Sequence, residues 1–447
     1  MKSFMLGMIK VLGCVSLLSA CTPYGNLKND SKSKQFATSD NWDVNDISVL
    51  YPLRNRFAGP SEGRLVRLTD GNGLMSQEQF ASVLRVFQNQ FGLDYYNGSQ
   101  ASFMNTLDKW VVTAFRLDHC FKRKLSDSCT PQVRIVAQAV PDNEMTTTDF
   151  SLHLFYEPEQ STLQLLEEMI RIRKENAAPE LADATLGKPL GVHPILGAKG
   201  GLSSKFAGAL KNEFLLKYLS PKNLTQIAVA FIEPDRLQPW IFFRDEAQSF
   251  SKAQDNSIFA FDPETSKNRC GVETGRLICR RDLNLGHIVD SQEKQDSNPR
   301  GFTPAGRTAD SKPYLDDFLT LIQKDTDTKN YSSVSQNLSY WEDVFNEIEN
   351  PEKLAPGDTN CASCHRTQTD RVRMRGIFTL NPTRGDFAFD GNNNSGCTPG
   401  IGIDYSQTGI KTFNVRMFGY MHERPIVGQR VANESVKVCK ELKAQLR

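Results

Sequence analysis

One short stretch, Cys361-Ala362-Ser363-Cys364-His365, constrains this chain more than any other. Two thiols separated by two residues, with a histidine directly after them, allow three kinds of chemistry. The thiols can add to the two vinyl groups of one haem while the histidine binds the iron. They can instead bind zinc together with the histidine and a fourth ligand, or they can form a redox disulfide. The compartment and the surrounding sequence decide between these.

The first 20 residues are typical of an export signal. A positively charged start leads into a short apolar run, Val11 to Leu18, which is too short to span a bilayer. The next residues complete Leu18-Ser19-Ala20-Cys21, which resembles the lipobox of bacterial lipoproteins, where the cysteine takes the lipid. An ordinary secretory signal cut after Ala20 is the alternative. The sequence therefore predicts export and a lipid anchor at Cys21, at the outer membrane on the periplasmic side or at the cell surface.

The ten cysteines divide into groups under this interpretation. Cys14 leaves with the signal, Cys21 takes the lipid, and two belong to the motif. The other six form an even set, which in an oxidising compartment predicts three disulfides, although some could remain buried thiols. Six cysteines allow several pairings, and proximity in the sequence favours Cys120–Cys129 and Cys270–Cys279, which leaves Cys397–Cys439.

Export favours the haem interpretation, because covalent haem attachment takes place in that compartment. A zinc site would need a fourth ligand, and no second C-x-x-C or paired-histidine motif accompanies the stretch. A redox dithiol usually opens a helix in a βαβ unit, which the neighbouring sequence does not indicate. The single motif therefore predicts one covalent haem c, attached through Cys361 and Cys364, with His365 as the proximal ligand of the iron.

Length and composition suggest two or three globular domains. The chain has 447 residues, of which 39% are hydrophobic and 23% charged, and its net charge of +1 gives no nucleic-acid signal. We predict a signal peptide at 1–20, a flexible tether at 21–40, an α+β domain at 41–330 and a smaller domain at 331–447. Residues 351–447 hold 14 Lys and Arg against nine Asp and Glu, which suits an acidic redox partner; ordinary scatter of surface charge is the plainer explanation.

Hydrophobic spacing predicts both strands and helices in residues 41–330. Because helices follow only some of the strands, the pattern favours an α+β fold with an antiparallel sheet over a doubly wound one. We find no catalytic motif in this region, and its role stays open. The predicted strands are 110–117, 133–140, 148–156, 227–232 and 240–243, and the predicted helices are 77–90, 161–173 and 206–218.

Residues from about 335 to 447 resemble a small c-type cytochrome domain. A helix expected at Ser335–Glu349 precedes the motif, and Asn433 is placed to cap a last helix at Glu434–Leu446. The resemblance covers about a quarter of the chain and rests on the motif between these helices. It implies a small, mainly α haem domain that transfers electrons to or from a redox partner protein.

The second axial ligand has three candidates. In the cytochromes that the domain resembles, a methionine lies shortly before the last helix. Met421 is nearest to the predicted helix and is narrowly preferred to Met417, while His422 would give bis-histidine ligation. Core packing is the commoner use of a methionine.

The arginines that follow the motif are candidates for binding haem propionates. Arg366, Arg371 and Arg373 lie within ten residues of it, and a guanidinium group binds a carboxylate through a fork of two hydrogen bonds. A solvated basic face is the alternative interpretation of the same residues.

Three functions are compatible with these features. The preferred one is an electron-transfer lipoprotein, in which residues 41–330 serve as a docking or scaffold module. The second is a haem enzyme, a peroxidase or oxidoreductase, with a substrate cleft in that domain. The third is a surface interaction protein with a structural haem. A thioether ligand to the iron suits electron transfer, and an open position suits peroxide chemistry.

Overall fold

The computed structural model describes residues 41–54, 63–91, 105–122, 128–148, 150–231, 240–246, 259–261, 269–273, 276–280, 289–290, 338–355, 367, 397 and 417–446. Its central element is an eight-stranded sheet in which every neighbouring pair of strands is antiparallel. In spatial order the strands are β1 (Ser48–Leu50), β2 (Trp110–Phe121), β3 (Thr130–Ala139), β4 (Ser151–Tyr156), β5 (Leu224–Phe231), β6 (Trp240–Glu246), β7 (Phe259–Phe261) and β10 (Val289–Asp290).

Most residues of β2 and β3 are buried, so apolar residues outnumber polar ones in both strands and do not simply alternate with them. Their register pairs Trp110 with Ala139 and Phe121 with Thr130, with irregularities between Val112 and Ala114 and between Asp118 and Phe121. The predicted antiparallel α+β fold is thus observed, with β2 running four residues beyond its predicted end.

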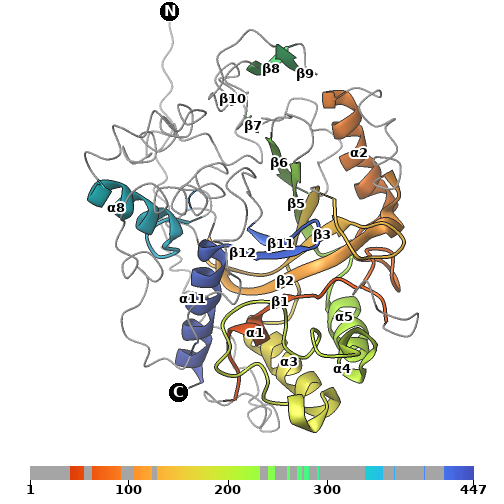
Figure 1. The fold of residues 1–447 in the computed structure, drawn as a ribbon, viewed down its shortest axis with the longest axis vertical. Helices are drawn as coiled ribbons and strands as arrows, with labels where there is room; N and C mark the ends of the chain where they lie inside the picture. The colour runs from red at the N-terminus through yellow and green to blue at the C-terminus, as the bar shows by residue number, and fades with distance from the viewer. Residues whose placement is uncertain are drawn as a thin grey trace, which may run out of the picture.

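Helices pack on one face of this sheet. Helix α3 (Thr162–Asn176) begins at a capping box, in which Ser161 and Gln164 each bind the other's backbone N–H. The predicted helix at 206–218 is present as α4 (Lys205–Ala209), a π-helical segment (Leu210–Leu215) and α5 (Leu216–Tyr218). From the π-helical segment, Phe214 stacks on Phe115 of β2 at 5.7 Å between ring centres. Figure 1 shows α3, α4 and α5 grouped below β1 and β2.

The C-terminal residues cover the opposite face of β2 and β3. A hairpin, β11 (Phe418–Met421) and β12 (Arg424–Val427), leads directly into helix α11 (Gln429–Gln445). The side-chain amide of Gln138 accepts from Tyr420 N–H at 2.7 Å and donates to its carbonyl at 2.8 Å, so it binds β11 as a neighbouring strand would. Gly419 allows this approach, because a Cβ atom there would lie 2.5 Å from the Gln138 carbonyl oxygen.

The last helix differs from its prediction at its start. It begins at Gln429 after Gly428, so Asn433 lies inside the helix and does not cap it. The hairpin explains the difference, because β12 ends at Val427 and the good helix formers that follow continue the chain without a loop. The prediction that Asn433 caps this helix is wrong.

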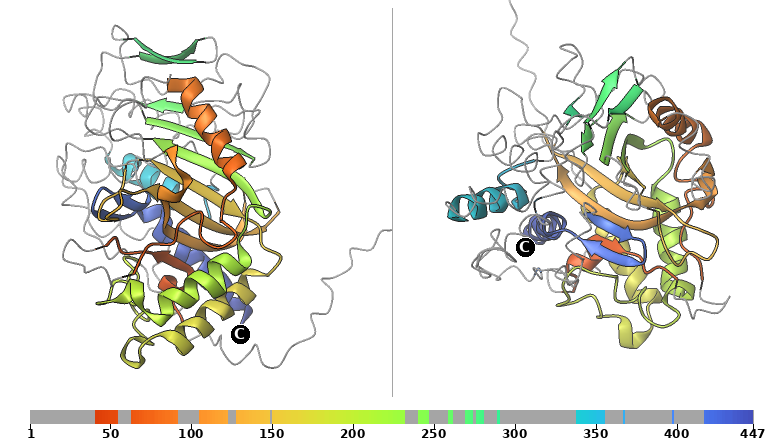
Figure 2. Two further views of the ribbon diagram at one scale, coloured as in Figure 1. Left: turned by 90° about the vertical axis from the view of Figure 1, so that its right-hand side faces the viewer. Right: turned by 45° about the horizontal axis from the view of Figure 1, so that its top comes forward.

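Two further helices and a second hairpin lie outside the groups described above. Helix α2 (Gln77–Phe91) covers the predicted 77–90, and α8 (Leu338–Glu349) lies within the predicted 335–349. A second hairpin, β8 (Arg269–Glu273) with β9 (Arg276–Arg280), forms a sheet separate from the main one, as Figure 2 shows. None of the helices in the described ranges is both long and apolar enough to cross a membrane.

One hydrophobic core includes residues from both predicted domains. Trp110 and Phe115 of the sheet belong to the same cluster of buried side chains as Phe345 of α8, Phe418 of β11 and Leu442 of α11. The predicted boundary at residue 330 therefore does not separate two cores among the described residues.

Candidate functional site

Most residues of the predicted haem site lie outside the described residues, and their roles stay predictions. This holds for the attachment residues, the proximal ligand, the propionate candidates and the lipidated cysteine: Cys361, Cys364, His365, Arg366, Arg371, Arg373 and Cys21. The structure does describe the positions that bracket the motif. Ala355 before it and Thr367 after it are both buried.

Chain geometry bounds the position of the motif relative to these two residues. An extended chain spans at most about 3.6 Å per residue, so Cys361 lies within roughly 22 Å of Ala355. His365 is two residues from Thr367, and the two Cα atoms are at most about 7 Å apart.

The chain leaves for the motif from the end of α8, and α11 holds that end. The Arg430 guanidinium donates from Nη1 to the carbonyl of Ile348 at 2.9 Å and from Nη2 to that of Leu354 at 2.5 Å. The Asn433 amide donates to the carbonyl of Glu349 at 2.9 Å. The last carbonyls of a helix lack partners within it, and here side chains from another helix supply them. Arg430 is only 3% exposed.

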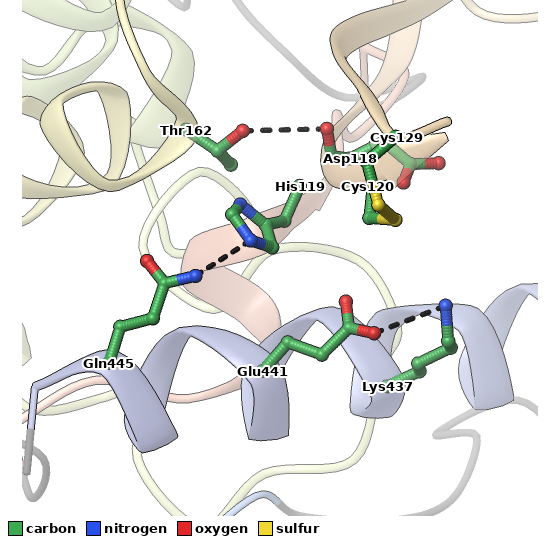
Figure 3. Close-up of a disulfide and its surroundings, with 8 residues drawn as sticks. All are labelled: Asp118, His119, Cys120, Cys129, Thr162, Lys437, Glu441 and Gln445. Atoms are coloured by element: carbon green, nitrogen blue, oxygen red, sulfur yellow. Dashed lines mark hydrogen bonds and ion pairs between the residues drawn. A yellow bond between two sulfur atoms is a disulfide. The ribbon is translucent and has the colours of Figure 1, made fainter. Parts of the chain in front are cut away.

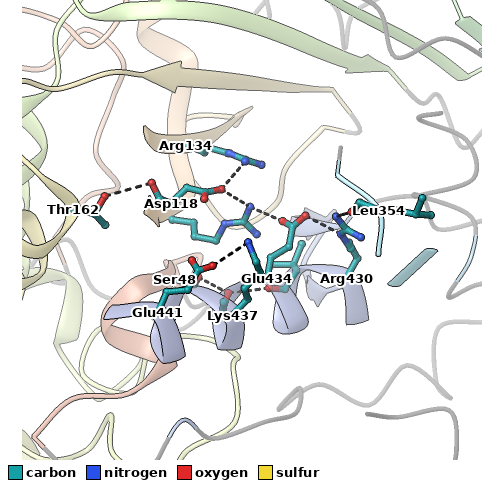
Figure 4. Close-up of polar contacts among 12 residues, drawn as sticks. Ser48, Asp118, Arg134, Thr162, Leu354, Arg430, Glu434, Lys437 and Glu441 are labelled. Carbon is teal, nitrogen blue, oxygen red and sulfur yellow. Dashed lines mark hydrogen bonds and ion pairs between the residues drawn. The ribbon is translucent and has the colours of Figure 1, made fainter. Parts of the chain in front are cut away.

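Arg430 belongs to a group of five charged residues that we call the arginine cluster: Arg116, Asp118, Arg134, Arg430 and Glu434. Arg116, Asp118 and Arg430 are buried, and Arg134 and Glu434 are partly buried. Glu434 pairs with Arg430 at 2.8 Å and with Arg116 of β2 at 2.5 Å. Asp118 pairs with Arg116 at 3.4 Å and with Arg134 of β3 at 2.5 Å. Figure 4 shows these contacts running from the sheet across α11 to Leu354.

The cluster holds three cations and two anions, so it carries one excess positive charge. Burial by itself would raise the pKa of Glu434, but Arg116, Arg430 and Arg134 together hold that pKa well below its usual range. Burial lowers the pKa of Arg134, and Arg116 and Arg430 lower it further, against the opposing effect of Asp118. The carboxylate of Glu434 is therefore ionised in the folded protein.

A small cleft of about 40 Å³ opens beside this cluster. Arg134, Arg430 and Glu434 line it, together with Pro351 and Ala355 from the turn after α8. A space of this size admits a few water molecules or a group no larger than a carboxylate. The cleft therefore joins the charged cluster to the point where the chain leaves for the motif.

Two of the three predicted disulfides are present and confirmed. Cys120–Cys129 closes the end of the β2–β3 hairpin, and Cys397–Cys439 ties a residue downstream of the motif to α11. Figure 3 shows the first of them close to His119, whose ring contacts Gln445 of α11 at 2.7 Å. These four cysteines are paired in two disulfides. None of them is therefore available to form a disulfide with Cys361 or Cys364.

The third predicted pair is compatible with the backbone. Strands β8 and β9 place Cys270 directly opposite Cys279 in their register. Cβ atoms at directly opposed antiparallel positions lie about 4.5–5.5 Å apart, and a disulfide needs a separation near the lower end of that range or slightly below it. The bond between these two cysteines stays a prediction.

The three candidates for the second axial ligand lie at two ends of one hairpin. Met417 is buried against Gly428, where an added Cβ would approach its sulfur to 2.8 Å. Met421 pairs with Arg424 at the other end of β11. His422 follows in the turn with a φ of +54°, and its carbonyl accepts from Thr147 N–H at 3.1 Å. The two methionines are four positions apart along the strand, which corresponds to about 13 Å.

Of these candidates, Met417 lies closest to the end of α8. Its neighbour Gly428 is two residues from Arg430, which contacts Leu354. Met421 and His422 lie at the far end of the hairpin, toward Thr147. Met421 is nearer than Met417 to the last helix in the sequence. In the structure β12 returns the chain from Met421 to the start of α11, so Met417 is the methionine beside that start.

Sequence reasoning missed the arginine cluster. The signal was present in β2, where Arg116 and Asp118 interrupt an apolar strand. Charged residues in a buried strand need partners, so a buried ion pair was predictable there. Its partner on α11 was not, because no spacing rule links residues more than 300 positions apart.

Metal ligands do not gather elsewhere in the part of the chain that the structure describes. No group of three or more His, Cys, Asp or Glu residues could hold a metal ion there. Comparison of the chain with protein-family models, with curated proteins and with solved structures finds no match.

Proposed function

We propose that this chain is an exported, lipid-anchored, mono-haem c-type cytochrome that transfers electrons. The observation that supports it best is the Cys361–His365 motif in a chain that forms disulfides. Disulfides persist in the oxidising compartments outside the cytosol, and covalent haem attachment belongs to the same compartments. The lipobox at Cys21 gives independent support for export.

The residues available fit a covalent haem. Cys361 and Cys364 supply the two thiols, and His365 supplies an imidazole next to the second thiol. The haem, when bound, supplies a one-electron couple whose potential depends on axial ligands, burial and nearby charge. The protein's own part is to hold the attachment segment, exclude water from it and set the surrounding charge.

Met417 is the first candidate for the second axial ligand in this proposal. It is buried and lies on the side of the hairpin nearest the end of α8. Replacement of Met417 by leucine should remove the sulfur-to-iron absorption band of the ferric protein, while the Met421→Leu protein should keep it. Loss of the band in Met421→Leu and its retention in Met417→Leu would reverse this order.

The direct test is haem attachment in the full chain. The protein is expressed with a cytochrome maturation system and stained for haem after denaturing electrophoresis. The wild type should stain, and the Cys361→Ala/Cys364→Ala protein should not. A matched control, Cys120→Ser/Cys129→Ser, removes two cysteines elsewhere and should stain normally. An unstained wild type would contradict the proposal.

A second measurement separates electron transfer from haem catalysis. A six-coordinate iron should react slowly with cyanide and peroxide, because an internal ligand occupies the second axial position. Rapid binding of cyanide to high-spin ferric protein would support a peroxidase or oxidoreductase instead.

A further inference from the structure

The C-terminal end of α8 is bound by side chains of α11, which is distant from it in the sequence. Ordinary helix ends are capped by nearby residues, but the carbonyls of Ile348 and Glu349 accept from Arg430 and Asn433, more than 80 residues downstream. Arg430 reaches beyond the helix as well, to the carbonyl of Leu354. One guanidinium group therefore fixes both the last turn of α8 and the turn that follows it.

The electrostatics of this contact favour a cation. The carbonyl end of a helix carries a partial negative charge, which a buried arginine complements. Hydrogen bonds from a charged donor are about twice as strong as neutral ones. Because Arg430 presents a planar fork of donors, it can bind two carbonyls and a carboxylate at once, which a lysine cannot do in the same geometry.

Arg430 is in turn fixed to the sheet. Its Nε pairs with Glu434, and Glu434 pairs with Arg116 of β2. Arg116 is 5% exposed and belongs to the longest strand of the sheet. The end of α8 is thereby connected, through two ion pairs, to a long and mostly buried strand of the central sheet.

We infer that Arg430 is the positioning residue of the haem-bearing segment: it fixes the point from which the chain departs toward Cys361–His365 relative to α11 and the sheet. This inference rests on the proposed function for its haem readout. The same contact places a positive charge beside that point, and positive charge favours the reduced, less positive state of the iron. If the attached haem lies close to this point, we expect Arg430 to affect its potential as well as the position of the segment that carries it.

The test uses the full, matured chain and two readouts. Hydrogen exchange reports on the amides of residues 348–354, and redox titration reports on the haem. In Arg430→Met, exchange in 348–354 should rise at least tenfold and the midpoint potential should fall. Arg430→Lys keeps the charge but loses the planar set of donors of the guanidinium group. Its midpoint potential should therefore be close to that of the wild type, while exchange in 348–354 should lie between the wild type and Arg430→Met.

A matched variant separates position from charge. Glu434→Gln removes the negative charge but keeps an amide oxygen that can accept from Arg430 Nε, and it leaves both carbonyl contacts of Arg430. It should therefore raise the potential and change exchange in 348–354 much less than Arg430→Met does. Asn433→Leu removes the third carbonyl contact without a change of charge and serves if Arg430→Met fails to fold. It should raise exchange near Glu349 severalfold.

The outcomes distinguish this inference from the proposed function. A haem-free wild type would contradict the proposed function, while the exchange readout would still test the contact. A haem-bearing wild type with the same exchange and the same potential in Arg430→Met would overturn the inference alone. Equal losses of potential in Arg430→Met and Arg430→Lys, with unchanged exchange in both, would also overturn it.

Discussion

Two buried arginines hold two different segments to the body of this protein. Arg173 of α3, which is 1% exposed, pairs with Asp46 at 3.1 Å and donates to the Thr185 hydroxyl and the Asn41 carbonyl. Asn41 directly follows the predicted tether. Arg430 does the same at the end of α8. In both places a buried guanidinium group donates hydrogen bonds to backbone carbonyls of a segment that is distant in the sequence.

The carboxylates of the two regions differ in their response to burial. Burial raises the pKa of Asp46, and its single arginine, Arg173, does not offset the effect. Three arginines surround Glu434 and hold its pKa well below the usual range. Asp46 is buried and Glu434 is partly buried, and burial by itself would raise the pKa of both, so burial alone does not decide the sign of the shift. The number of nearby cations decides the sign of the pKa shift.

The largest expected effect separates the two arginines by stability. Arg173→Met leaves Asp46 buried without a cation, which should cost about 3–5 kcal/mol in the free energy of unfolding. Arg430→Met leaves Glu434 paired with Arg116, so we expect a smaller loss of about 1–3 kcal/mol. Chemical denaturation of the two variants measures both. Equal losses would show that the extra arginines around Glu434 contribute nothing.

Acid stability should distinguish the two carboxylates. A depressed folded pKa stabilises the protein above the unfolded pKa, and this stability is lost as the pH falls through the folded pKa. Glu434 should therefore lose stabilising energy below pH ~4.3, and Glu434→Gln should flatten that part of the curve by about 1.4 kcal/mol per pH unit.

Asp46 should behave in the opposite way. Its raised pKa favours the folded state at pH values below the unfolded pKa, and that contribution is lost as the pH rises through the folded pKa. Asp46→Asn should remove this loss. Denaturation midpoints of both variants between about pH 3 and 7 give the two slopes, and slopes of the same sign would break the comparison.

A buried histidine near Arg173 adds a further acid response. Burial, and then Arg173, lower the pKa of His193 to about 3. The unfolded chain takes up this proton near pH ~6.5, so the folded state loses stability as the pH falls below that value. His193→Gln should reduce the slope between roughly pH 6 and 4. The Glu434→Gln protein, whose change lies at lower pH, serves as its control.

The smallest effect is expected at an arginine that is not buried. Arg171 of α3 pairs with Glu168 and Glu175 of the same helix and with Glu213 of the π-helical segment, and its side chain is 26% exposed. Arg171→Gln should cost less than about 1 kcal/mol, because surface ion pairs are screened by water and salt. A loss as large as that of Arg430→Met would mean that the number of ion pairs, and not their burial, sets the energy.

Local patterns predicted much of this fold. Apolar and β-branched runs placed β2 to β6, and helical spacing placed α2, α3 and α8. Proximity in the sequence identified Cys120–Cys129, and Cys397–Cys439 followed because these two cysteines were left after the nearby ones were paired. The start of α11 could not be predicted, since Asn433 is a good cap by type but is used elsewhere. The contacts of Arg430 were out of reach for the same reason, because they depend on tertiary structure alone.

The meeting of β1 with α11 has a consequence for the order of folding. Ser48 and Ser435 share a hydrogen bond of 2.6 Å across 387 positions of the chain. Such distant contacts are slow to form, and a chain that crosses a membrane from its N-terminus exposes Ser48 long before Ser435. The contact between β1 and α11 therefore forms only after the last helix is available, whereas β1 can pair with β2 earlier. In the proposed exported cytochrome, Cys361 and Cys364 would emerge before this contact closes, so we expect their thiols to be accessible to a maturation enzyme at that stage.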